Sequence, residues 1–536
     1  MSEAVDNVVR FESTDESSWL TPMRCRLLLA GFVILSFGLN LVYLQHCPID
    51  LAGDEAQYWD WSRHLDWSYY SKGPAIAYII RASCAMFGDT AAAVRYPAVA
   101  LTSGTTIVTY LFTRKLFGSD RLALGASLLL NALPIFVVGG FYMTIDAPMF
   151  FCWALATYFA AIAIFDDRQW SWVFVGFLIG LGFLAKYSEL LWFIGLFGFL
   201  LTQRPRQLRG AAIALLIAVL CTFPVIVWNV QHGWVSLRHV ARQTGASEGV
   251  FSLWDMVVFI GGQLAVVGPT MWIMMIAAIV YALRSRADEQ NSNHSQLAFL
   301  LWIGLPFLAL NFLDSFRAKV QLNWPAPAYF TLTILTAYFL GTRWRDYQQW
   351  KPNRGWFWIT IAVAVIFTPI ARDTSIIYPL LRPVAAFTKR DLGELDLLQR
   401  VRGWHQLGRN VSDQLLEMGP GTFILCDDYQ QTAEMAFYVD GHLKTYCAGP
   451  YFGKRWSQYD MWQDRRLDAQ SPLLSMNAIY IGKGDRLPPA VEASFERVEK
   501  QPSLDIEVAG AKIRSFKTWR CFGFKGMQRS NEPADY

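Results

Sequence analysis

The sequence is poor in charged residues. Asp, Glu, Lys and Arg make up only 17% of its 536 residues, whereas soluble globular proteins contain about 25%. The formal net charge of +4 is small for a chain of this length. Together these values argue against a cytosolic enzyme, a disordered chain and a nucleic-acid-binding protein.

Short motifs for cofactors and metals are missing as well. The eight cysteines form no CxxC pair and no Cys/His spacing typical of a metal site. No GxGxxG motif follows a predicted strand, and no P-loop occurs. Nothing in the sequence therefore indicates a nucleotide-binding site.

Long apolar runs are what the sequence does contain. Apolar residues make up 54% of the chain, and about 20 of them in helical conformation cross a bilayer once. A large soluble helical protein does not carry so many long uncharged runs. We count eleven candidate membrane spans, at residues 27–45, 94–113, 121–140, 147–165, 170–185, 189–203, 210–228, 255–283, 295–313, 324–341 and 356–371. The eighth contains Gly268 and Pro269 and is expected to bend there.

Charge is distributed unevenly along the chain. Charged residues make up about 13% of residues 1–371 and about 26% of residues 372–536, which predicts a polytopic helical membrane region at 27–371 followed by a soluble domain.

With residues 1–26 inside, the inside segments hold sixteen Lys and Arg residues and the outside loops nine, as the positive-inside rule requires. Eleven spans then place residues 372–536 outside. The polar start of the chain predicts no cleavable signal peptide.

The pattern of residues 372–536 predicts a small α/β domain. Its expected elements are an amphipathic helix at 394–418, a strand at 422–426, a helix near 430–438, strands at 478–481 and 506–508, and a hairpin turned by Gly510 into residues 511–519. Asp427 and Asp428 end the first of these strands, where sites often lie, but a solvated strand end is the favoured explanation.

The most informative stretch is the first outer loop, residues 46–95. Asp54 is a suitable N-cap for a short helix, on which Asp54, Tyr58 and Trp61 share one face. Aromatic residues typical of a helix at the membrane interface follow, namely Trp59, Trp61, Trp67, Tyr69 and Tyr70. We therefore expect interfacial helices that hold Asp54, Glu55 and Lys72 near the membrane surface. Capping alone remains an alternative explanation of Asp54.

Further charged residues, and the polar Asn323, lie beside the predicted spans. Asp146 opens the fourth span, Lys186 lies between two short spans, and Arg317, Lys319 and Asn323 precede the tenth. Charges at the edge of an apolar span are costly unless paired or hydrated, so they are functional hypotheses by default. Helix capping by Asp146 and snorkelling of Lys186 are the simpler alternatives. Carboxylates beside cations suit a general base and a phosphate leaving group.

At these residues the sequence resembles the GT-C membrane glycosyltransferases. Within them it is similar to the protein O-mannosyltransferase branch, which includes the bacterial aminoarabinose transferase of lipid A and related lipopolysaccharide sugar transferases. The resemblance covers about residues 27–345. Its motifs are DEAQY at 54–58, KGP at 72–74, AVRYP at 93–97, FG at 117–118, TIDAP at 144–148, GLGFLAKY at 180–187, Pro224, Trp228-Asn229, Lys319 and Asn323-Trp324-Pro325. The chain departs from the aminoarabinose transferases at Gln57, where they carry a basic residue, and at Gly73, where they carry proline.

The resemblance implies a transferase whose sugar donor is carried on a polyprenyl phosphate and whose site faces the periplasm. Asp54 is then the general base or the group that orients the acceptor hydroxyl, and the sugar C1 is attacked opposite the phosphate, with inversion. Asp146 and Glu55 complete the catalytic carboxylates. The cations that match for the leaving phosphate are Lys72, Lys186, Arg317 and Lys319. The substrate pocket is expected to include Tyr58, Tyr70, Arg95 and Asn323.

Cofactors and partners follow from the same interpretation. We expect no obligatory cofactor, although Asp54, Glu55 and Asp146 offer oxygen ligands to a divalent cation. The expected partners are the polyprenyl-phosphate-linked sugar, a lipid or glycan acceptor such as lipopolysaccharide, and membrane lipid, with no nucleic acid. The chain is expected to be a monomer in a bacterial inner membrane. The alternatives are a protein O-mannosyltransferase, an enzyme that moves a preassembled glycan, and a transporter or flippase of lipid-linked sugars.

The predicted topology is directly testable. A phosphatase fused after Tyr536 is expected to be active, because an inside N-terminus and eleven crossings place the C-terminus outside the cytoplasm. A fluorescent protein that matures only in the cytoplasm is the matched control and is expected to stay dark at the same position. An inactive phosphatase together with a bright fluorescent fusion would contradict the topology.

Overall fold

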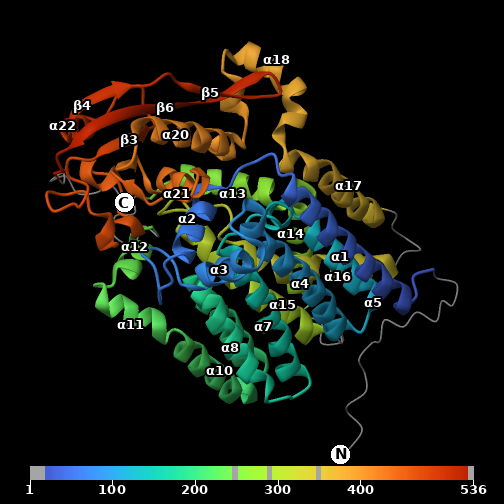
Figure 1. The fold of residues 1–536 in the computed structure, drawn as a ribbon. Helices are drawn as coiled ribbons and strands as arrows, with labels where there is room; N and C mark the ends of the chain where they lie inside the picture. Colours follow the sequence, from blue (N-terminus) through green and yellow to red (C-terminus); the bar gives the residue numbers. More distant parts are fainter. Residues whose placement is uncertain (1–18, 244–250, 286–292, 346–351, 529–536) are drawn as a thin grey trace, which may run out of the picture.

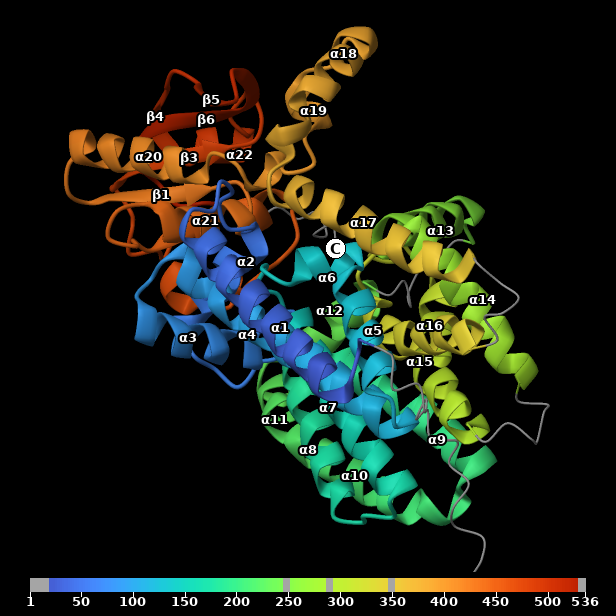
Figure 2. The same ribbon diagram turned by 90° about the vertical axis from the view of Figure 1, so that its right-hand side faces the viewer.

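A computed structural model describes residues 19–243, 251–285, 293–345 and 352–528 of the chain. Most of the predicted N-terminal segment 1–26, namely residues 1–18, and residues 529–536 lie outside the described residues. Helices dominate up to residue 388, and a β-sheet with its helices follows (Figure 1). We call residues 22–372 the helical region and residues 392–524 the sheet region. The sheet region lies at one end of the helical region (Figures 1 and 2), here called its domain-side end.

Each of the eleven predicted spans falls on one helix or on two consecutive helices. These helices are α1 (Pro22–Gln45), α4 (Ala91–Phe117), α5 (Asp120–Asn131), α6 (Pro134–Gly139), α7 (Asp146–Phe165), α8 (Ser171–Ala185), α9 (Trp192–Gln203), α10 (Leu208–Cys221), α11 (Phe223–Gln231), α13 (Leu253–Val267), α14 (Pro269–Ser285), α15 (His294–Asp314), α16 (Ala326–Arg345) and α17 (Pro352–Arg372). By length and composition, 4 helices among the described residues can cross a membrane, or up to 6 if each bent pair is one span. The count of eleven therefore stays a prediction.

The expected bend in the eighth predicted span is present. Helices α13 and α14 meet at 104°, and Gly268 between them has φ +88°, a conformation that residues with a side chain rarely adopt. Pro269 then begins α14, where its missing N–H costs nothing. The Gly-Pro pair thus turns the chain at the place that the sequence indicates.

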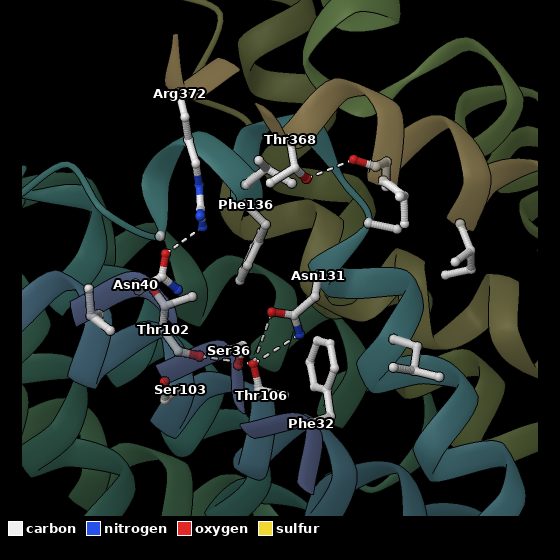
Figure 3. Close-up of a pocket in the computed structure, with 18 residues that line it drawn as sticks. Phe32, Ser36, Asn40, Thr102, Ser103, Thr106, Asn131, Phe136, Thr368 and Arg372 are labelled. Atoms are coloured by element: carbon white, nitrogen blue, oxygen red, sulfur yellow. Dashed lines mark hydrogen bonds between the residues drawn. The ribbon is translucent and has the colours of Figure 1, made fainter. Parts of the chain in front are cut away.

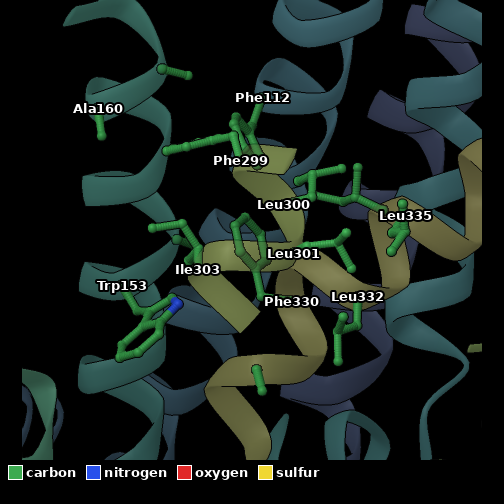
Figure 4. Close-up of a cluster of buried hydrophobic side chains, with 14 of the residues drawn as sticks. Phe112, Trp153, Ala160, Phe299, Leu300, Leu301, Ile303, Phe330, Leu332 and Leu335 are labelled. Atoms are coloured by element: carbon green, nitrogen blue, oxygen red, sulfur yellow. The ribbon is translucent and has the colours of Figure 1, made fainter. Parts of the chain in front are cut away.

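Helices α4, α7, α15 and α16 contribute to the centre of the apolar core of the helical region, which residues of α5, α8, α9, α10 and α14 extend (Figure 4). Phe112 of α4 stacks on Phe330 of α16 with ring centroids 5.7 Å apart, and Trp153 of α7 packs edge-on against Phe307 of α15 at 5.2 Å. The small residues Ala156 and Ala160 of α7 are fully buried, which lets neighbouring helices approach closely. This packing gives the loops at the domain-side end a rigid base.

The sheet region contains six strands and two long helices. The strands are β1 (Thr422–Cys426), β2 (Thr445–Cys447), β3 (Asn477–Gly482), β4 (Phe495–Lys500), β5 (Leu504–Val508) and β6 (Ala511–Phe524), in the order β2-β1-β3-β6-β4 with β5 on the other half of β6. β1 is parallel to β2 and β3, and the other pairs are antiparallel. The predicted strands and the hairpin at Gly510 are confirmed. β2 and β4 were not predicted, because β2 has three residues and β4 is largely polar.

The helix predicted at 394–418 is wrong in its first part. The structure has a short α19 (Leu392–Leu395) and then α20 (Trp404–Met418), separated by Gly403 with φ +87°. Between them Asp396 accepts hydrogen bonds from the Tyr378 hydroxyl at 2.8 Å and from Arg402 Nε at 2.9 Å. A buried charged side chain with these partners fixes an irregular segment that the apolar spacing alone does not reveal.

The first outer loop forms α2 (Gly53–Ser62) and α3 (Ala75–Phe87), but its aromatic residues do not lie against lipid. Trp59, Trp61, Tyr69 and Tyr70 are at most 2% exposed, and only Trp67 of the five is open, at 53%. The reason is α21 (Tyr429–Tyr438) of the sheet region, which packs on α2 and sets Phe437 edge-on to Trp59 at 4.8 Å. The predicted interfacial helix is therefore a helix buried between the two regions.

Candidate active site between the helical and sheet regions

Asp54 stands in the first turn of α2 with its side chain exposed. The predicted capping role is wrong, because the N-cap is Ala52 and its N–H donates to Glu55 Oε2 at 2.9 Å. Asp54 accepts one weak hydrogen bond, from Gln430 Nε2 of α21 at 3.5 Å. Gly53 allows this approach, since a Cβ there would meet Gln430 Cβ at 2.7 Å. Glu55 thus supports the helix start and leaves the Asp54 carboxylate available.

Glu55 and Arg95 form an ion pair in which both side chains are 0% exposed. Arg95 Nη2 donates to Glu55 Oε2 at 2.7 Å, and the Met143 N–H donates to Oε1 at 2.8 Å. Arg95 also donates to the carbonyl oxygens of Ile49 and Asp50. The structure therefore places Glu55 and Arg95 in the scaffold beneath the loop, although the sequence suggested a catalytic carboxylate and a pocket residue.

Asp146, Lys186 and Asn323 meet at the domain-side end from three different helices or turns. Lys186 Nζ donates to Asp146 Oδ1 at 2.7 Å, and Asn323 Nδ2 donates to Asp146 Oδ2 at 2.6 Å. Asp146 is the first residue of α7, where Ile145 is the N-cap, so its side chain does not cap the helix. Lys186 lies at the break between α8 and the 3₁₀ turn Tyr187–Leu191, and its ammonium group binds Asp146 instead of extending into solvent.

Lys72 joins this group through the tight turn that follows it. Gly73 lies against the Leu184 carbonyl oxygen and leaves no room for a Cβ, so the turn touches the end of α8 just before Lys186. Burial and then the charge of Lys186 lower the pKa of Lys72, Asp54 and Asp146 oppose the shift, and the resulting pKa is about 8. The four charged groups therefore share one electrostatic environment.

A cavity of about 140 Å³ opens beside the two lysines. Its polar lining includes Lys72, Lys186, Ser188 and Asp314, and its apolar lining consists mainly of Leu191, Val240, Phe307, Leu310 and Trp324. A cavity with cations and apolar side chains fits a ligand that has an anionic head and a hydrocarbon chain.

Four predicted site residues remain, namely Tyr58, Tyr70, Arg317 and Lys319. Tyr58 is 3% exposed, and its pKa is raised by burial and then by the charges of Asp54 and Asp146. Tyr70 is buried, donates its N–H to Gln458 Oε1 at 2.7 Å and packs against His239. Arg317 and Lys319 are exposed in the turn between α15 and α16.

Arg455 of the sheet region is a site residue that the sequence analysis missed. Its guanidinium lies over the Tyr429 ring at 5.0 Å, and its Nε is buried without a hydrogen-bond partner among the described residues. Burial, then the charge of Arg455 and then that of Lys72 lower the pKa of His239 to about 3. Arg455 thus faces Lys72 from the opposite region, 383 residues later in the sequence. In the sequence, the only signal for this residue is the pair Lys454-Arg455 between the aromatic residues Phe452 and Trp456.

The three candidate carboxylates do not fit a shared metal ion. The Glu55 carboxylate already binds Arg95 and backbone N–H groups. The Asp146 carboxylate already binds Lys186 and Asn323. Within the parts of the chain that the structure describes, no group of three His, Cys, Asp or Glu residues is arranged to hold a metal.

Comparison with known proteins gives a family match and a curated relative. Residues 71–228 match the family described as dolichyl-phosphate-mannose-protein mannosyltransferase. The lipid A galacturonosyltransferase RgtD of Rhizobium johnstonii is 28% identical over 431 residues, which cover 78% of this chain and 84% of RgtD.

Two crystal structures of ArnT from Cupriavidus metallidurans share the fold. The apo structure gives a TM-score of 0.58 and the structure bound to undecaprenyl phosphate gives 0.59, each at 15% identity and over 92% of this chain and 97% of ArnT. At this identity the likeness concerns the fold, and it extends over nearly the whole chain.

Proposed function

We propose that this chain is a GT-C membrane glycosyltransferase of the ArnT and protein O-mannosyltransferase branch, and that it transfers a sugar from a polyprenyl phosphate to a hydroxyl group of a cell-envelope glycolipid. One observation carries the proposal. The exposed carboxylate of Asp54 shares its electrostatic environment with two lysines that line a cavity of mixed polar and apolar character. A base and a phosphate-binding pair are the two parts that this reaction needs.

The reaction follows from the placement of these groups. Asp54 accepts the proton of the acceptor hydroxyl, and the resulting oxygen nucleophile attacks C1 of the sugar. The bond from C1 to the phosphate oxygen breaks on the opposite side, and the lipid phosphate leaves with the bonding electron pair. Lys72 and Lys186 stabilise the charge that develops on the phosphate. Attack opposite the leaving group inverts the configuration at C1.

The donor is a lipid in this proposal because the cavity at the lysines has apolar walls. The ArnT structure with undecaprenyl phosphate supports this choice, since it has the same fold. The domain-side end, with Asp54 and the sheet region, then faces the periplasm of a bacterial inner membrane. Lipid-linked sugars supply such a site because nucleotide sugars are absent there.

A lipid acceptor is favoured over a protein acceptor. RgtD, whose name states a lipid A acceptor, aligns with most of this chain, whereas the match to the protein mannosyltransferase family is confined to residues 71–228. A transporter of lipid-linked sugars needs no exposed carboxylate beside the phosphate-binding cations. The proposed enzyme therefore accounts for Asp54, and transport alone does not.

The transferred sugar is an acidic hexose in this proposal. Around Asp54 and Asp146 stand three cations, Lys72, Lys186 and Arg455. Asp146 balances the charge of Lys186, and the leaving phosphate binds Lys72. The Arg455 guanidinium therefore remains available to bind a second anion. A sugar carboxylate matches a guanidinium in shape and charge. The name of RgtD, a galacturonosyltransferase, supports a hexuronic acid.

Replacing the base is expected to stop transfer without unfolding the protein. Asp54→Asn should lower turnover by about 10²–10⁴-fold, the usual contribution of a general base. Its melting temperature should stay unchanged, because the side chain is exposed and caps no helix. The matched control is Glu55→Gln, which leaves Arg95 buried without its partner and should cost about 3–5 kcal/mol of stability. Near-normal turnover of Asp54→Asn with lipid-linked donor would contradict the role of Asp54.

The pKa of Lys72 gives a pH dependence. Lys72 carries its charge below a pH of about 8 and loses it above, so kcat/KM for the donor is expected to fall as pH rises through about 8. Lys72→Arg keeps a charge at these pH values and should move the fall to higher pH, with part of the activity retained. Lys186→Arg is the control and should leave the midpoint in place. The same midpoint in wild type and Lys72→Arg would rule out Lys72 as its source.

The preference for an acidic sugar is expected to depend on Arg455. Wild-type enzyme should prefer a polyprenyl-phosphate hexuronic acid over the neutral hexose, and Arg455→Gln should reduce that preference about tenfold or more, as expected for a lost charge-assisted hydrogen bond. Lys454→Gln is the neighbouring control, because Lys454 pairs with Asp427 at 2.9 Å. Equal use of both donors by the wild type would refute the assignment of an acidic sugar.

A further inference from the structure

A second cavity lies among helices that carry none of the four charged site residues Asp54, Lys72, Asp146 and Lys186. It has a volume of about 230 Å³ and is lined by α1, α4, α5, α6 and α17 (Figure 3). The cavity at Lys72 and Lys186 is lined by none of these helices. Its size is below the roughly 300 Å³ at which pockets for whole drug-sized molecules begin, so it suits the head of a larger molecule.

The lining of this cavity is unusually polar for the middle of apolar helices. Its hydroxyl and amide side chains are Ser36, Asn40, Thr102, Ser103, Thr106 and Asn131. Asn131 Nδ2 donates to Thr106 Oγ1 at 2.9 Å, and Thr106 Oγ1 donates to the Thr102 carbonyl oxygen at 3.0 Å (Figure 3). The hydroxyl and amide groups that line the cavity can in addition hydrogen-bond a ligand that has oxygen atoms.

Arg372, the last residue of α17, brings a positive charge to the domain-side end of the cavity. Its Nη2 donates to Asn40 Oδ1 at 2.5 Å (Figure 3). Its guanidinium also lies over the Tyr43 ring at 4.9 Å. Its Nε is buried without a hydrogen-bond partner, and no carboxylate of the described residues lies within ion-pair distance. Asp373, the adjacent acid, is bound to Arg402 at 2.7 Å. A half-buried guanidinium without an anion calls for an anionic ligand.

The helices around this cavity also place it at the edge of the protein that faces lipid. In the apolar windows of α1 and α17 only 11% and 22% of the residues are buried, against 67% in α7. A cavity between two such exposed helices is reached from the bilayer without crossing the protein core. Arg372 at the helix end then stands at the depth of lipid headgroups.

We propose that this cavity binds the phosphate-bearing head of an acylated membrane lipid that is distinct from the sugar donor. Arg372 and Asn40 bind the phosphate, the row of hydroxyl and amide groups hydrogen-bonds the glycerol and ester oxygens, and the acyl chains remain in the bilayer along α1 and α17. The site is separate from the reaction centre, so it holds a lipid throughout turnover.

Native mass spectrometry of the full chain in detergent tests this site. Phosphatidylglycerol is the probe, diacylglycerol with the same chains tests the need for phosphate, and inorganic phosphate tests for a free anion. Wild type should retain one phosphatidylglycerol, diacylglycerol should not bind, and millimolar inorganic phosphate should not displace the lipid. Arg372→Gln should weaken retention about tenfold or more.

Two further variants keep the result interpretable if Arg372→Gln folds poorly. Ser103→Leu fills the cavity without removing a charge and should weaken lipid retention equally. Arg382→Gln removes an exposed arginine of α18 (Tyr378–Thr388) that binds the Ala509 carbonyl oxygen and should retain the lipid as wild type does. The proposal is overturned if Arg372→Gln and Ser103→Leu both retain phosphatidylglycerol normally. It is also overturned if diacylglycerol binds equally well or inorganic phosphate alone displaces the lipid.

Discussion

The buried ion pair between Glu55 and Arg95 determines where both candidate aspartates stand. Glu55 holds the start of α2 through the Ala52 N–H, holds α4 through Arg95, and holds the segment before α7 through the Met143 N–H. Asp54 is the neighbour of Glu55 in the chain, and Asp146 follows Met143 by three residues. Removing one partner of a fully buried pair costs about 3–5 kcal/mol, because the other charge remains without compensation. The position of each aspartate thus depends on a pair that touches neither.

The sheet region completes the site that the helical region begins. Gln430 of α21 approaches Gly53 and Asp54, Gln458 binds the Tyr70 N–H, and Arg455 adds its charge opposite Lys72. Because α21 also covers the aromatic face of α2, the same contact that buries Trp59 brings these polar groups to Asp54. The sheet region therefore belongs to the candidate site, and the helical region alone leaves Asp54 open on one side.

Local patterns in the sequence predict the parts of this structure that depend on neighbouring residues. Apolar runs locate the helices, the Gly268-Pro269 pair locates the bend, and the charged and polar residues beside the spans single out Asp54, Lys72, Asp146, Lys186 and Asn323. Patterns of this kind do not show which surface covers another. The buried face of α2 and the role of Arg455 both arise from contacts with the sheet region, several hundred residues later. Glu55 and Asp54 are adjacent and chemically alike, so only the structure shows that Glu55 turns inward and Asp54 outward.

The two lysines of the candidate site differ in a way that suits the proposed reaction. Lys186 is balanced by Asp146, which Asn323 holds in place, so this pair adds little net charge but a fixed geometry. Lys72 has no ion-pair partner among the described residues, and burial lowers its pKa to about 8. An arriving phosphate favours the charged form of Lys72, and the negative charge that grows as the C1–O bond breaks favours it further. Two free lysines would bind the intact donor more tightly and gain less from bond breaking, whereas catalysis depends on interactions that strengthen in the transition state.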